Sequence, residues 1–157
     1  MKLFKYIMSV ALISMILSCS VSDDNDSNDP TIQIANVQNT VQNGSWRITS
    51  FVDSGQNETS DFSGYNFTFG DNGVLTASNG ATTLTGTWSV TNSSNSSSSS
   101  SSDDDIDFNI FFPVPESNDF EDLNDDWDIV SFSSTRIELI DISGGNGGTD
   151  TLVFESN

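Results

Sequence analysis

The residues able to do chemistry in this chain of 157 residues are few in kind. Cys19 is the only cysteine, there is no histidine, and the only lysines are Lys2 and Lys5. Without an imidazole, a second thiol or a lysine further along the chain, the usual nucleophile and general-base arrangements have no members. No Gly-x-Ser-x-Gly segment presents a nucleophilic serine. The 23 acidic residues would form some carboxylate pair in any fold, so we expect no catalytic residue and no enzyme.

Carboxylates could instead bind calcium, which prefers oxygen ligands. Asp122, Asn124 and Asp126 have the alternate spacing of an EF-hand loop, but Trp127 stands at its turn glycine and Ser133 at its closing glutamate. The stretch 145–152 resembles one nonapeptide calcium repeat, and a single copy has no stacked neighbour to complete the ion cage. We therefore predict no metal site and no cofactor, and a chelator experiment would reveal a calcium site.

The thiol of Cys19 stands at the end of a secretory signal. Residues 1–18 begin with Lys2 and Lys5 and continue as an uncharged, mostly apolar run from Tyr6 to Ser18. A positive start followed by a short apolar segment is typical of a signal peptide. A membrane span would need about 20 apolar residues, which this run does not reach. We expect residues 1–18 to be removed.

Cys19 also has the surroundings of a lipid-attachment cysteine. Ile16-Leu17-Ser18-Cys19 resembles the lipobox of bacterial lipoproteins, with an aliphatic residue three places before the cysteine and a small residue directly before it. The resemblance implies a diacylglyceryl group on the thiol and usually an acyl chain such as palmitate on the new amine. Two or three such chains anchor a protein to a bilayer, at about 0.8 kcal/mol per buried methylene. A plain secretory signal with an incidental cysteine is the alternative.

The location follows from the same region. Ser22-Asp23-Asp24 resembles the short signal that sends some Gram-negative lipoproteins to the outer face of the outer membrane. Beyond residue 18, Arg47 and Arg136 are the only basic residues against 23 acidic ones. A nucleic acid or an anionic membrane surface would therefore be repelled. We expect a protein of the bacterial outer membrane, facing the exterior, whose partner is the bilayer and whose anchor is the acylated Cys19.

Residues 19–30 are polar and acidic, as in a flexible tether, and residues 31–157 suffice for one folded domain. Ile34, Val37 and Val41 follow one another at spacings of three and four, which predicts a short helix or turn over residues 31–43 covering one end of the domain. The serine-rich stretch from Asn92 to Ser102 is expected to be a loop.

From Trp46 onward the hydrophobic period changes to two, which is typical of strands. Eight strands are expected, at 46–52, 63–69, 74–78, 82–91, 105–112, 127–132, 135–141 and 149–155. Glycine and asparagine in residues 70–73 and 79–80 supply tight hairpin turns. Eight strands in up-and-down order can close on themselves, so we predict an all-β, eight-stranded antiparallel barrel with a short N-terminal helix or turn.

Two short motifs resemble those of lipocalins. Gly44-Ser45-Trp46 matches the Gly-x-Trp motif at the start of the lipocalin barrel. Gly86-Thr87-Trp88 is similar to a pattern in the lipocalin-like domain of many bacterial surface lipoproteins. The resemblance covers residues 41–154 and implies that Gly44 and Trp46 plug the closed end of the barrel. It also implies an arginine stacked on the tryptophan, for which Arg136 is the candidate, an exposed Arg136 being the alternative.

The resemblance further implies an apolar pocket in the barrel, under a lid formed by a helical turn of the loop 113–126. Seven side chains are candidates for binding a small apolar or amphipathic ligand: Tyr65, Phe67, Trp88, Phe108, Phe112, Phe120 and Leu123. The interior could equally be filled by its own side chains, as in many small barrels. In that alternative the protein is a non-enzymatic interaction module at the cell surface, with a protein partner that the sequence does not identify.

Overall fold

The structure is a computed structural model that describes residues 29–92, 106–142 and 148–157. The predicted signal peptide, Cys19, most of the predicted tether and most of the serine-rich stretch lie outside these ranges. The elements are α1 (Pro30–Val41), β1 (Trp46–Asp53), β2 (Gln56–Asn57), η1 (Thr59–Phe62), β3 (Asn66–Phe69), β4 (Val74–Ser78), β5 (Thr83–Asn92), β6 (Ile106–Phe111), η2 (Glu121–Leu123), β7 (Asp125–Phe132), β8 (Arg136–Ile142) and β9 (Thr149–Ser156).

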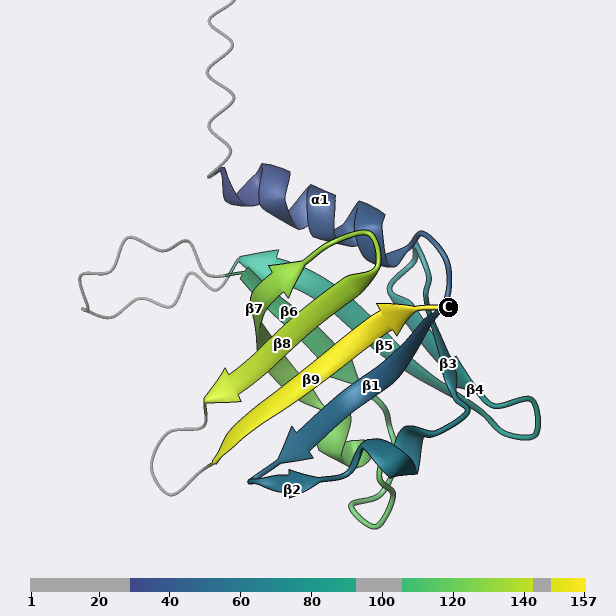
Figure 1. The fold of residues 1–157 in the computed structure, drawn as a ribbon. Coiled ribbons are helices and arrows are strands. Elements are labelled where there is room, and N and C mark those ends of the chain that lie inside the picture. The colour runs from purple at the N-terminus through teal and green to yellow at the C-terminus, as the bar shows by residue number, and fades with distance from the viewer. Residues whose placement is uncertain (1–28, 93–105, 143–147) are drawn as a thin grey trace, which may run out of the picture.

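Eight of the strands form a closed antiparallel barrel (Figure 1). Strands β1 and β3 to β9 follow one another around it, and β9 pairs with β1 from Trp46↔Ser156 to Val52↔Thr151. The two-residue strand β2 pairs with the far end of β1. The predicted fold class, an all-β up-and-down barrel of eight strands with a short N-terminal helix, is confirmed.

The period of two places one face of each strand inward. In β3, Phe67 and Phe69 are buried while Asn66 and Thr68 are exposed. The hairpin between β3 and β4 is closed by the Gly70 amide, which donates to the Val74 carbonyl at 2.8 Å. Gly73 in this turn has a φ of 77°, a conformation that favours glycine. The strand and turn predictions for this region therefore follow from local chemistry.

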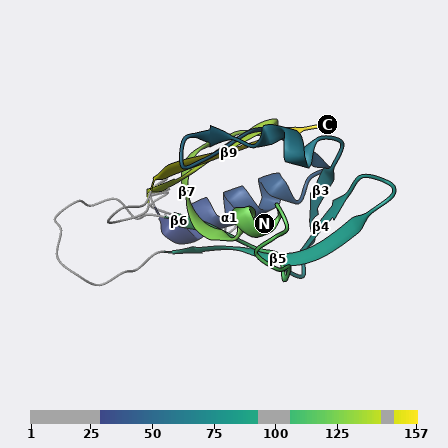
Figure 2. The same cartoon turned by 90° about the horizontal axis from the view of Figure 1, so that it is seen from below.

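Helix α1 lies across one end of the barrel, between the wall formed by β9 and that formed by β5 (Figure 2). It begins at Pro30 because the Asp29 side chain accepts a hydrogen bond from the Thr31 amide at 2.9 Å. Val37 and Val41 are buried against the barrel, and the Trp46 indole donates to the Val41 carbonyl at 2.8 Å. The predicted helix over one end of the domain is confirmed, with an aspartate cap that its hydrophobic spacing did not reveal.

The strand expected over residues 63–69 is shorter in the structure. The 3-10 turn η1 ends at Phe62, and β3 starts only at Asn66, so residues 63–65 are not part of the strand. Gly64 has a φ of 83°, and the Tyr65 amide donates back to the Phe62 carbonyl at 3.1 Å. This local turn interrupts extended backbone, so the strand is shorter than its apolar pattern predicts.

Candidate functional site

The side chains predicted to line a ligand pocket are packed together inside the barrel. Phe120 is at the centre of this packing, with ring centroids 4.9 Å from Tyr65, 5.1 Å from Phe112 and 6.0 Å from Phe67. Edge-to-face and offset contacts at these distances are the favoured arrangements of aromatic rings. Phe120 directly precedes η2, so the helical turn predicted in the loop 113–126 exists, and it is anchored in the core.

The other predicted pocket residues are packed in the same way. Trp88 stacks on Phe108 with centroids 5.9 Å apart, and Leu123 is fully buried. Of the seven candidates, only Tyr65 is more than 9% exposed. The structure therefore places all seven in or against the hydrophobic core, where they contact one another, as in the filled-barrel alternative.

Of the three residues predicted to plug the barrel, Arg136 lies apart from Gly44 and Trp46. Trp46 is fully buried beneath α1, and Gly44 in the connection to β1 has a φ of 109°. Arg136 does not lie over Trp46 but on the outer face, where it pairs with Glu138 at 2.6 Å and Glu155 at 2.8 Å. These hydrogen bonds raise the pKa of Arg136. The expected stack on the tryptophan is thus replaced by the exposed arginine of the alternative, because carboxylates on β8 and β9 attract the guanidinium outward.

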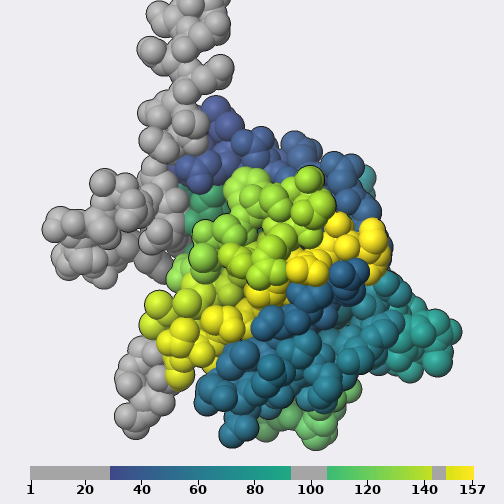
Figure 3. All heavy atoms as spheres, viewed as in Figure 1, coloured from purple at the N-terminus to yellow at the C-terminus, as the bar shows by residue number. Residues whose placement is uncertain are grey.

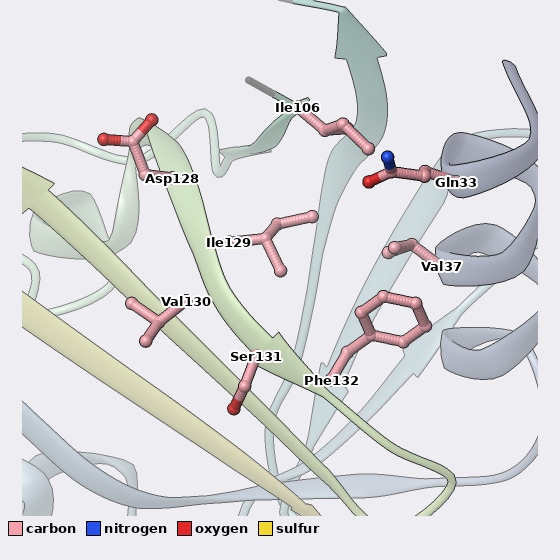
Figure 4. A pocket seen from close by; sticks show the side chains of 8 residues that line it. All are labelled: Gln33, Val37, Ile106, Asp128, Ile129, Val130, Ser131 and Phe132. Atoms are coloured by element: carbon pink, nitrogen blue, oxygen red, sulfur yellow. The ribbon is translucent and has the colours of Figure 1, made fainter. Parts of the chain in front are cut away.

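A groove at the edge of the packed core lies between α1, the start of β6 and the end of β7 (Figure 4). Its volume is about 440 Å³, within the range of small-molecule sites. Eight residues from three separate elements line it, five of them apolar: Gln33, Val37, Ile106, Asp128, Ile129, Val130, Ser131 and Phe132. The amide of Gln33 lies at the same wall, on α1. In Figure 4 the side chains of Asp128, Val130 and Ser131 point away from the helix.

A β-bulge in β7 directs Phe132 into this groove. Ile129 pairs with Leu139 and Phe132 with Ile137, so three residue steps on β7 oppose two on β8. The extra residue reverses the alternation, and Phe132 faces α1 like Ile129 rather than the exterior. The side chain remains 40% exposed, because it lies at the groove surface.

A second hollow continues from the first along α1 and the β7–β8 turn. It has a volume of about 400 Å³ and shares Phe132 with the groove. Its other lining residues are uncharged and polar: Asn36, Asn39, Thr40, Asn43 and Ser134. In the space-filling view, α1 lies directly against the β7–β8 hairpin along this surface (Figure 3).

The opposite end of the barrel is acidic. Desolvation raises the pKa of Glu58, and so does the charge of Asp122 and of other nearby carboxylates. Desolvation likewise raises the pKa of Asp122 itself, followed by repulsion from Asp53. In the part of the chain that the structure describes, no three acidic, cysteine or histidine side chains form a group that could hold a metal ion.

One residue of the EF-hand-like spacing, Asn124, has a structural role. The Asn124 side-chain oxygen accepts from the Phe112 amide, and its side-chain nitrogen donates to the Phe112 carbonyl at 3.0 Å. These two bonds hold the loop between β6 and β7 together at its base. In the stretch 145–152, which resembles a calcium repeat, residues 145–147 lie outside the described residues and residues 149–152 belong to β9.

The chain was compared with protein-family models, curated proteins and solved structures. No family model matches the chain, and no curated protein does. Among solved structures, the chain is similar to the crystal structure of a duf4847 family protein from Bacteroides vulgatus ATCC 8482. The two are 20% identical, the match covers 77% of this chain and 97% of that chain, and the TM-score is 0.46.

None of the seven residues expected to bind a ligand lines the groove. Of its lining, only Val37 was singled out, and as a helix residue that covers the barrel. Asn36, Asn39 and Asn43, at spacings of three and four, are a signal that could have indicated a polar helix face beside it. The contribution of Phe132 had no such signal, because it depends on the bulge.

We expect the domain to be more stable near pH 5 than near pH 7.5. Burial raises the pKa of Asp125 from 3.8 to about 6, with Asp126 and Asp141 as further causes, while the Asp126 amide opposes them. The folded state therefore keeps a proton that the unfolded state has released, and this stabilisation is lost as the pH rises through about 6. Allowing for solvent screening, the difference is about 1 kcal/mol, measurable by chemical unfolding at the two pH values.

The variant Asp125→Asn tests whether the pH dependence of stability comes from Asp125 or from the other carboxylates at this end of the barrel. The amide retains an oxygen that can accept the Asp126 amide at 2.8 Å, and it cannot ionise. We expect this variant to be stabilised near pH 7.5 and to have a flatter pH dependence. Asp71→Asn, at an exposed hairpin turn, is the control that removes the same charge. An unchanged pH dependence in Asp125→Asn would contradict the assignment.

Proposed function

We propose that this protein is a lipid-anchored, non-enzymatic binding protein of the bacterial outer membrane that holds a small apolar or amphipathic molecule non-covalently. The site is the groove between α1, β6 and β7. The observation that carries this proposal is a groove of about 440 Å³ beside α1, in which Ile129 and Phe132 keep accessible apolar surface. Binding derives from burial of apolar surface, at about 25 cal/mol per Å².

The packing of the barrel supports this position of the site. The seven candidates inside the barrel already contact one another, so a ligand there would have to displace aromatic side chains. Side chains that line the groove need no such displacement, and Phe132 and Gln33 retain exposed surface. The barrel then acts as a rigid scaffold, and α1 completes the site.

The anchoring part of the proposal rests on the residues around Cys19 and on where α1 begins. Pro30 is both the last residue of the proposed tether and the first residue of α1, so the groove lies on the end of the barrel that the tether joins. In residues 29–92, 106–142 and 148–157, no helix is long and apolar enough to cross a membrane. Acyl chains on Cys19 would therefore supply the attachment, close to a source of amphipathic molecules.

Native mass spectrometry of the protein purified from its own cells tests the binding proposal. We expect a co-purified non-covalent mass that is reduced in Phe132→Ser and retained in Phe111→Ser. Both residues are exposed phenylalanines, 40% and 54% exposed, but Phe111 lies on the outer face of β6 away from the groove. Equal loss from both variants, or no bound mass, would count against the groove.

An interaction module is the second candidate, and the filled interior favours it. Val130 and Ile142 are 59% and 66% exposed on the outer faces of β7 and β8, where a protein partner could cover them. Under this alternative, affinity purification yields a stoichiometric protein partner, and Val130→Ser together with Ile142→Ser disrupts the complex. Phe132→Ser would then leave the protein's associations unchanged.

A further inference from the structure

Three Asn-Gly pairs lie in the part of the chain that the structure describes: Asn43-Gly44, Asn72-Gly73 and Asn79-Gly80. In such a pair the glycine nitrogen has no β-carbon beside it, so it can approach the carbonyl carbon Cγ of the asparagine side chain. Attack there closes a five-membered succinimide ring, a reaction that makes asparagine a thermolabile residue. All three asparagines are exposed, so access of water does not distinguish the pairs.

Asn79 and Gly80 lie in the tight turn between β4 and β5. The side-chain oxygen Oδ1 of Asn79 accepts two backbone hydrogen bonds, from the Ala81 amide at 3.1 Å and from the Thr82 amide at 2.8 Å. Attack on Cγ places negative charge on this oxygen. Two donors that already point at it stabilise that charge, as in an oxyanion hole. The turn therefore favours the transition state of ring closure at Asn79.

The attacking and leaving nitrogens of this pair are weakly held. The Gly80 amide, which attacks, donates to the Ser78 hydroxyl at 3.3 Å, longer than an ordinary N–H···O bond. The side-chain nitrogen Nδ2 of Asn79, which leaves, makes no hydrogen bond among the described residues. Neither nitrogen has to break a strong hydrogen bond within the protein before it reacts.

Asn43 has the opposite arrangement. Its side-chain nitrogen donates to the Asn39 carbonyl at 2.7 Å, so the leaving group is held in place. The attacking Gly44 amide donates to the Gln42 carbonyl at 3.2 Å. Among the described residues, no donor is bonded to the Asn43 side-chain oxygen. Ring closure at Asn43 would therefore break hydrogen bonds without the charge stabilisation that Asn79 receives.

Asn72 is intermediate between the two. Its side-chain oxygen accepts one hydrogen bond, from the Val74 amide at 3.2 Å. The attacking Gly73 amide donates to the Gly70 carbonyl at 3.1 Å, within the β3–β4 turn. Attack by this nitrogen costs a backbone hydrogen bond of the turn, so we expect Asn72 to react more slowly than Asn79.

We propose that Asn79 is a site of spontaneous covalent modification, at which the folded hairpin promotes deamidation. The Gly80 nitrogen forms a bond to Asn79 Cγ and releases its proton to water. The Cγ–Nδ2 bond breaks, and Nδ2 takes up a proton and leaves as ammonia. One water then opens the ring at either carbonyl, which leaves an aspartate or an isoaspartate with a new carboxylate. This inference goes beyond the proposed binding function and does not depend on it.

Peptide mapping of the aged protein tests the proposal. The folded protein is incubated in warm neutral buffer made with heavy-oxygen water, which labels each newly formed carboxylate, and is then digested with chymotrypsin. Trp46 and Leu75 lie between the three pairs, so cleavage after them places each pair on its own peptide. We expect mass spectrometry to show deamidation of the Asn79 peptide at least about tenfold faster than of the Asn43 or the Asn72 peptide.

The same incubation in concentrated urea is the control for the role of the fold. Unfolding removes the hydrogen bonds that distinguish the pairs, so the three peptides should then react at similar rates. Asn79→Gln should abolish the labelling of its own peptide, because glutamine would have to close a larger ring, and should leave the other two unchanged. Deamidation of Asn43 or Asn72 as fast as Asn79 in the folded protein would overturn the proposal, and so would a lead of Asn79 that persists in urea.

Discussion

Replacing Cys19 by alanine should move the protein from the membrane fraction to the soluble fraction almost completely. The proposed acyl chains attach to the thiol and to the amine of Cys19, and each buried methylene contributes about 0.8 kcal/mol to membrane affinity. The acidic domain gives no electrostatic help, because anionic lipids would repel it. Fractionation of cells with metabolic labelling by a fatty-acid analogue measures both location and acylation.

Ser20→Ala is the matched control for this experiment, since it alters the adjacent residue and leaves the thiol. We expect it to be labelled and membrane-bound like the original protein. Circular dichroism and a melting curve of the soluble Cys19→Ala protein should match those of the domain, because Cys19 precedes all the elements that the structure describes. A Cys19→Ala protein that stays in the membrane fraction would refute acylation as the anchor.

Gly86→Ala should destabilise the barrel by about 3 kcal/mol, although alanine usually suits a strand better than glycine. A β-carbon at Gly86 would collide with the carbonyl oxygen of Phe111 and lie 2.9 Å from the Phe112 ring. The closest atom belongs to the backbone of β6, so relief requires the strand to move rather than a side chain to rotate. Urea unfolding monitored by tryptophan fluorescence measures the loss.

Thr87→Ala is the neighbouring control on the exposed face of β5, and we expect it to cost less than about 1 kcal/mol. Because the collision is with a carbonyl, adding Phe112→Leu to Gly86→Ala should restore little of the lost stability. A Gly86→Ala protein as stable as the original would show that β5 and the end of β6 are further apart than in this structure. The glycine of the Gly86-Thr87-Trp88 motif thus has a physical reason, which is the approach of the chain as it leaves β6.

Strand positions could be predicted well, because period-two alternation and turn chemistry are local properties. The expected strand at 74–78 coincides with β4, and the expected strand at 149–155 lacks only the last residue of β9. Local competition explains the main difference, since the turn around Gly64 shortens β3. The start of α1 was missed by one residue, because Asp29 and Pro30 signal a helix through capping rather than through hydrophobic spacing.

The proposed site could not be predicted in the same way. Ile106 and Phe132 come from strands far apart in the sequence from α1, and they meet Val37 only because the barrel closes and the helix lies across its end. Whether the barrel holds a pocket or is filled by its own side chains depends on the interior volume. The residue types alone did not decide between these two alternatives. Phe120 decides it here, by filling the space among Tyr65, Phe67 and Phe112.

The sequence by itself determined the acidic charge, the order of the strands, the hairpin turns and the prediction of an anchor at Cys19, because each depends on neighbouring residues. Only the tertiary structure decided which apolar side chains stay accessible. One extra residue in the β7 bulge turns Phe132 toward α1, and strand alternation alone would place it outward. Register and packing between distant segments set that orientation, and they place the candidate site beside α1 rather than inside the barrel.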